Sequence, residues 1–133
     1  MKGAKYVSLF ILILIVLTSC GGYQLKLYSG PELDKSQIST IISDDRYVTI
    51  GGVDGELIKV NFVSGFFIAL LGTSRFPSTV TVLPGAHMIM PCWEGPYARG
   101  CSRRWIPIET KAGQNYYVKP KPLDNRIIDY WID

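Results

Sequence analysis

The stretch RYVTIGGVDGELIKVNFV, residues 46–63, predicts two β-strands joined by a tight turn. Residues 46–53 are rich in β-branched side chains, and residues 57–63 alternate between two sets of side chains, as a strand requires. Between them, Asp54-Gly55 is a pair that favours a type I′ hairpin, because both residue types tolerate positive φ. The stretch therefore indicates an antiparallel hairpin.

The remainder of the chain continues this pattern of short strands between turn formers. Pro84-Gly85 and Ala112-Gly113 predict turns, whereas Pro120 and Pro122 predict a break, because proline cannot donate to a ladder. The other expected strands cover residues 23–28, 36–43, 77–83, 87–90, 105–110, 116–118 and 127–132. Short strands without a helical pattern predict an all-β domain over residues 36–133, a small immunoglobulin-like or transthyretin-like β-sandwich, with a barrel as the alternative.

Residues 1–19 have the features of an export signal. Lys2 and Lys5 precede an apolar run over residues 6–17, which is shorter than the roughly 20 residues of a membrane-spanning helix. Leu17-Thr18-Ser19-Cys20 resembles the lipobox of bacterial lipoproteins, which implies a diacylglycerol thioether on Cys20 and a third acyl chain on its amine. The alternatives are an uncleaved membrane helix and an ordinary secretory signal.

A lipidated Cys20 would make residues 20–35 a tether and entry segment, and Gly21-Gly22 suits a flexible connection. Two or more acyl chains anchor a protein stably where one is marginal. In Gram-negative lipoproteins, a residue other than Asp after the Cys usually permits transfer to the outer membrane. The resemblance therefore implies a lipid-anchored protein of the outer membrane that faces the periplasm.

Composition excludes one class of partner. Without residues 1–19 the chain has 114 residues, enough for one domain with its own core. Loss of Lys2 and Lys5 leaves 12 basic against 11 acidic residues. Because phosphate-backbone binding needs a concentrated basic stripe, nucleic acid is not expected as a partner.

Cys92 and Cys101 remain once Cys20 is lipidated. An even pair in an exported protein predicts a disulfide, because the periplasm is oxidising. The closed loop is short, so its entropic stabilisation is about 2–3 kcal/mol. The alternative is a metal site with His87, but zinc takes three or four ligands and the spacing is unpromising. No metal and no cofactor is expected.

Residues 64–72 contain Phe66-Phe67-Ile68-Ala69-Leu70-Leu71, an apolar run without alternation. One interpretation is a buried strand or short helix of the core. The other is an exposed hydrophobic loop that contacts lipid or a partner. Periodicity does not decide between them.

Four short motifs together resemble a group of proteobacterial lipoproteins and, more distantly, β-sandwich modules of the PEGA and DUF2846 type. They are Tyr28-x-Gly30-Pro31, Val53-Asp54-Gly55, Leu83-Pro84-Gly85-x-His87 and Ala112-Gly113-x-x-Tyr116. The resemblance spans most of the chain after Cys20. Pro84-Gly85-Ala86 departs from the PEGA signature because it lacks the acidic residue. The resemblance implies a β-sandwich scaffold and supplies no activity that can be assigned to these positions.

Two polar groups are weak catalytic or metal candidates. His87 would need a nucleophile and an orienting acid to act as a general base, and its ring is expected to bond backbone near the Pro84-Gly85 turn instead. Asp44-Asp45 and Asp54 lack the alternating oxygen ligands of a calcium loop, so solvated turns are the better interpretation.

A candidate binding patch combines flat aromatic faces with bidentate guanidinium donors. This combination suits a glycan, lipid headgroups or a protein hot spot. The alternative is a hairpin whose tryptophans pack inward while its arginines are merely solvated. The patch comprises Trp93, Tyr97, Arg99, Arg103, Arg104 and Trp105.

These features favour a non-enzymatic binding or assembly module held at the outer membrane, with an envelope protein or a glycan as its partner. The alternative is a structural subunit or stabiliser of a larger envelope or secretion complex. A hydrolytic enzyme ranks last, because the sequence offers no ordered set of catalytic residues.

Overall fold

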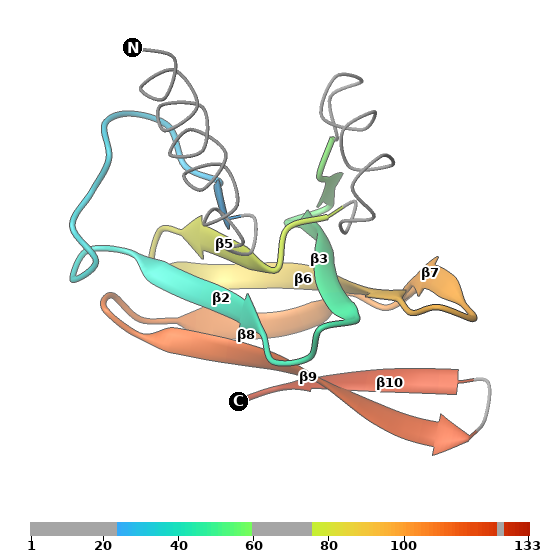
Figure 1. Ribbon diagram of the computed structural model, residues 1–133. Helices are drawn as coiled ribbons and strands as arrows, with labels where there is room; N and C mark the ends of the chain where they lie inside the picture. Colours follow the sequence, from blue (N-terminus) through green and yellow to red (C-terminus); the bar gives the residue numbers. More distant parts are fainter. Residues whose placement is uncertain (1–23, 60–75, 125–126) are drawn as a thin grey trace, which may run out of the picture.

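The computed structural model describes residues 24–59, 76–124 and 127–133, which form ten strands and no helix (Figure 1). The predicted signal peptide, Cys20 and the apolar stretch 64–72 lie outside the described residues. The strands are β1 (Gln24–Lys26), β2 (Ser39–Ser43), β3 (Val48–Val53), β4 (Glu56–Leu57), β5 (Thr79–Val82), β6 (Gly85–Glu94), β7 (Arg99–Cys101), β8 (Ile106–Thr110), β9 (Asn115–Asp124) and β10 (Ile127–Ile132).

The strands form two five-stranded sheets. The first has the order β1-β5-β2-β9-β10, and the second has the order β4-β3-β6-β7, with β8 pairing the other half of β6. Two pairs in the first sheet, β1 with β5 and β2 with β9, are parallel. The short strand expected over residues 23–28 is present as β1, so the chain joins this sheet at Gln24.

One hydrophobic core lies between the two sheets. The first sheet contributes Ile41, Val80 and Val118, and the second contributes Ile50 and Ile89, all of them fully buried. Each such aliphatic side chain stabilises the fold by about 1.5–3 kcal/mol through its burial. The all-β prediction is confirmed, and the two sheets share a single core.

The hairpin predicted at Asp54-Gly55 is present. Asp54 has a φ of 54° and Gly55 a φ of 85°, the positive values that a type I′ turn requires. Val53 and Glu56 pair on either side of the turn. The return strand was expected over residues 57–63, but β4 begins at Glu56 and ends at Leu57 within the described residues.

Pro120 and Pro122 do not break the chain as predicted, because β9 runs through both of them. Tyr117 and Asp133 exchange two backbone hydrogen bonds of 2.8 and 3.0 Å, so every second residue of β9 from Tyr117 onward points its N–H toward β10. The two prolines occupy the alternate positions, where the missing N–H would point away from β10. There, β2 has already ended at Ser43, so no ladder bond is lost.

On β10, the same alternation turns the backbone N–H of Tyr130 toward the outer edge of the sheet. That N–H donates to Oδ1 of the neighbouring Asp129 at 2.9 Å. The Tyr130 ring packs against the core. Its half-burial raises the pKa of the Tyr130 hydroxyl to about 12.

Candidate functional site

Cys92 and Cys101 form the predicted disulfide. They lie directly opposite each other on β6 and β7, with a Cα–Cα distance of 3.8 Å. The segment between them was expected to be a loop. Instead, β6 continues to Glu94 and β7 pairs back onto it from Arg99, so the disulfide ties together two strands of a hairpin.

The disulfide packs on β3 at Gly51. A Cβ atom at this position would lie 2.1 Å from Sγ of Cys92, 3.1 Å from Cε of Met90 and 3.2 Å from Sγ of Cys101. No side chain fits there, so glycine is required for the sulfur atoms to approach the strand. Gly51 thus couples the hairpin to the centre of the second sheet.

The two tryptophans of the predicted patch are packed against other residues and half-buried. Trp93 packs against the core, and its ring centroid lies 5.3 Å from that of Tyr47. Trp105 covers Gly52, where a Cβ atom would lie 2.7 Å from Cη2 of the indole. Trp93 therefore packs inward, and Trp105 is half-buried over β3.

The other four residues of the patch remain in solvent. Tyr97 is fully exposed, and Arg99, Arg103 and Arg104 are exposed on and after β7. Among the described residues, none of these three arginines forms an ion pair. The exposed part of the predicted patch therefore consists of three arginines on and after β7 and the ring of Tyr97 in the β6–β7 turn.

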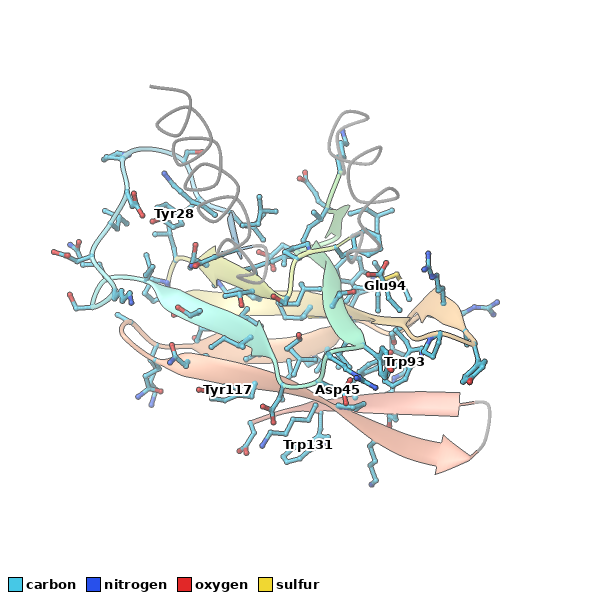
Figure 2. The ribbon with its side chains drawn as sticks, viewed as in Figure 1. Tyr28, Asp45, Trp93, Glu94, Tyr117 and Trp131 are labelled. Carbon is cyan, nitrogen blue, oxygen red and sulfur yellow. A yellow bond between two sulfur atoms is a disulfide. The ribbon has the colours of Figure 1, made fainter. Side chains whose placement is uncertain are left out.

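Arg46 belongs to the same end of the molecule and was missed by the sequence analysis. Its guanidinium lies 4.4 Å from the ring centroid of Tyr47, which in turn packs on Trp93. Figure 2 shows Trp93 beside the β2–β3 connection, which carries Asp45. Only the pairing of β3 with β6 brings these residues together, so no local sequence pattern indicates the contact.

A hydrogen bond between the side chains of His87 and Asp54 connects two turns. Nδ1 of His87 lies 2.8 Å from Oδ2 of Asp54, and Nε2 lies 2.7 Å from the carbonyl oxygen of Leu83. The Met88 N–H donates to Oδ1 of Asp54 at 2.8 Å. The predicted backbone contact of His87 is therefore present, and Asp54 does more than cap a solvated turn.

Asp54 and His87 are placed like the acid and the base of a catalytic dyad, but the ring nitrogen that would face a nucleophile is already hydrogen-bonded. Both ring nitrogens of His87 face oxygen acceptors, and Nε2, which would have to receive a proton from a nucleophile, is occupied by Leu83. The His87 side chain is 15% exposed and that of Asp54 is 50% exposed. The His87–Asp54 contact connects the β3–β4 turn to the β5–β6 turn.

Partial burial raises the pKa of Asp54, but the hydrogen bonds from His87 and Met88 outweigh it, so the net pKa lies below the ordinary 3.8. A depressed pKa in the folded protein means that the carboxylate stabilises the fold above pH 3.8. This contribution is lost as the pH falls through the folded pKa. Asp54→Asn retains an acceptor oxygen and tolerates positive φ, so it removes mainly the charge.

We expect Asp54→Asn to lower the free energy of unfolding by about 1 kcal/mol at pH 7, discounted for the exposure of the carboxylate. The difference from the parent protein should vanish at a pH below the folded pKa, where the parent carboxyl is also neutral. Urea unfolding at the two pH values measures this, with the exposed Glu32→Gln as control. An equal loss at both pH values would assign the effect to turn geometry instead of charge.

A second exposed surface lies on the outer face of the first sheet. Tyr117 on β9 is 36% exposed and Trp131 on β10 is 46% exposed, and both project from the same side of the molecule (Figure 2). Between them, Nζ of Lys119 lies 4.9 Å from the Trp131 ring centroid. Lys119 is itself held by Asp133 at 3.2 Å and by Asp44 at 3.9 Å.

This surface, which we call the Tyr117–Trp131 face, is pre-organised. Lys119 and Trp131 are paired across β9 and β10, so the Lys119 ammonium lies over one face of the indole. Nearly half of the Trp131 surface is still exposed to solvent. Such fixed aromatic area binds partners at low entropic cost. Sequence analysis missed it because the register of β9 against β10 defines it.

No metal site is found in the described part of the chain. The sulfurs of Cys92 and Cys101 are bonded to each other, and residues 24–59, 76–124 and 127–133 contain no group of three or more metal-ligating side chains. The same residues include no helix that could cross a membrane.

No family model, curated protein or solved structure matches this chain. The resemblance to proteobacterial lipoproteins and to PEGA-type modules therefore stays a prediction from the sequence motifs. Function has to be argued from the surfaces described above.

Proposed function

We propose that this protein is a non-enzymatic lipoprotein, anchored through Cys20 to the outer membrane and facing the periplasm, whose β-sandwich is a binding module. The anchor is inferred from residues 1–20. The Cys92–Cys101 disulfide suits an oxidising compartment such as the periplasm. The occupied nitrogens of His87 argue against hydrolytic chemistry at the dyad.

The observation that carries the binding role is the Tyr117–Trp131 face. Interface hot spots are enriched in Trp and Tyr, and a ring already fixed by a cation loses little freedom on binding. Neighbouring carboxylates, Asp44 and Asp133, can accept hydrogen bonds at the rim. An envelope protein or a glycan is the proposed partner. The alternative role is a structural subunit of a larger envelope or secretion complex, to which the same face would belong.

Trp131→Ala tests this role. In the unacylated Cys20→Ser chain, it should lower retention on purified envelope fractions by roughly tenfold or more, because truncating an aromatic hot spot typically costs 2 kcal/mol or above. Leu83→Ala is the matched control, since Leu83 and Trp131 are both 46% exposed. Equal retention of the two variants would remove this face as the binding site.

A further inference from the structure

Four exposed arginines lie on the β2–β3 connection, on β7 and just after β7. Arg46 lies in the β2–β3 connection, Arg99 in β7, and Arg103 and Arg104 in the turn after β7. The strand pairing brings Arg46 and Arg99 to the same end, because the carbonyl of Tyr47 accepts a hydrogen bond from the Glu94 N–H at 2.8 Å and Glu94 pairs with Arg99. Arg103 and Arg104 follow along the same edge of β6, between Ser102, whose N–H donates to the carbonyl of Pro91, and Ile106, which pairs with Ile89. β7 projects from this end of the second sheet (Figure 1). We call this surface the arginine end.

The arginine end carries exposed positive charge. In the described part of the chain none of its four guanidinium groups forms an ion pair. Three carboxylates lie near these arginines. Asp44 faces Lys119 at 3.9 Å, Oδ1 of Asp45 accepts the Tyr47 N–H at 2.7 Å, and Glu94, which pairs with Arg99 across β6 and β7, also has an interaction partner. Planar guanidinium forks match the oxygen geometry of phosphate.

The point at which the chain enters the sheet lies toward the same end. Gln24 pairs with Thr79, Thr79 with Ile42, and Ile42 with Tyr117, so β1 begins level with the last residues of β2, from which the Arg46 connection departs. Only three residues separate Cys20 from Gln24, so their Cα atoms are at most about 14 Å apart even when the chain is fully extended. An acyl group on Cys20 would hold this end close to the lipid headgroups.

We propose that the arginine end docks on the phosphate groups of anionic phospholipids in the bilayer that holds the anchor. The proposal rests on the proposed function, because the anchor at Cys20 brings the two surfaces together. Two observations support it: the arginines complement the charge of the phosphate groups, and the connection from Cys20 to β1 is short. With the acyl chains already providing stable attachment, the arginines set the orientation of the domain on the bilayer.

Vesicle binding tests this without the anchor. The unacylated Cys20→Ser chain should cosediment with phosphatidylcholine vesicles that contain phosphatidylglycerol, and not with phosphatidylcholine alone. Arg103→Ser with Arg104→Ser should lower the partition coefficient by roughly tenfold or more, since each basic residue near an anionic surface contributes about fivefold. Lys35→Ser with Lys111→Ser, two exposed lysines at the opposite end of the sandwich, should leave it unchanged.

Equal loss in both double variants, or no preference for anionic vesicles, would overturn the proposal. Binding of inorganic phosphate without any binding to the anionic vesicles would overturn the assignment to lipid. The proposed function is tested separately, because the vesicle assay uses a chain without the acyl group. Native protein that carries no acyl group on Cys20 would contradict the proposed function and leave the vesicle result unaffected. A circular dichroism spectrum like that of the parent confirms that each variant is folded.

Discussion

Cys20→Ser should move nearly all of the protein from the membrane fraction to the soluble periplasmic fraction. Each buried methylene contributes about 0.8 kcal/mol to membrane attachment, so two or three acyl chains make it effectively permanent, and serine cannot form the thioether. Cell fractionation followed by mass spectrometry of the N-terminal peptide measures both the location and the modification.

Gly21→Asp is the matched control for Cys20→Ser. It should leave the acyl group in place and shift the protein from the outer to the inner membrane, which separates the anchor from its address. Membrane retention of Cys20→Ser with an intact leader would instead show an uncleaved membrane helix. Soluble native protein with an unmodified Cys20 would show an ordinary secretory signal.

Gly51→Ala should destabilise the domain by about 3 kcal/mol, at the upper end of the range for overpacked cores. The added Cβ would lie 2.1 Å from Sγ of Cys92, and the disulfide cannot withdraw because Cys101 holds it on β7. Since a domain of this size is stable by only about 5–15 kcal/mol, the loss is large. Urea unfolding under oxidising conditions measures it.

Gly100→Ala is the control for the substitution type, because no atom lies within 4 Å of a Cβ at that position. The cause is tested in a background with Cys92→Ala and Cys101→Ala. There, Gly51→Ala should cost at least about 1 kcal/mol less, a coupling expected of residues in direct contact. An undiminished cost without the sulfurs would assign the effect to Met90 or to the backbone of β3.

The sequence predicted those features that depend on neighbouring residues. Asp54-Gly55 encodes its own turn, because the two positive φ values are local properties of the residue types. The alternating and β-branched runs predicted strands at the positions of β2, β3, β5, β8 and β10. The disulfide was predicted because Cys92 and Cys101 are the two cysteines other than Cys20 and the chain was expected to reach an oxidising compartment.

Features that depend on strand register could not be predicted. The position of Pro120 and Pro122 within β9 is tolerated only because β2 ends at Ser43 and β10 lies on the other side. Trp93 was grouped with the arginines that follow it in sequence, but pairing of β3 with β6 placed it against Tyr47. The Lys119–Trp131 contact likewise requires the β9–β10 register.

The C-terminal hairpin is poorly suited to templating fibrils. An exposed strand such as β10, which has the sequence Ile-Ile-Asp-Tyr-Trp-Ile, would ordinarily recruit a second strand through its free amide hydrogens. Here the central outward amide, that of Tyr130, is already bonded to Asp129. On the opposite side of the hairpin, Pro120 and Pro122 have no amide hydrogen to offer. Neighbouring copies crowded together would find few donors there, so this strand-rich hairpin resists aggregation through its own edges.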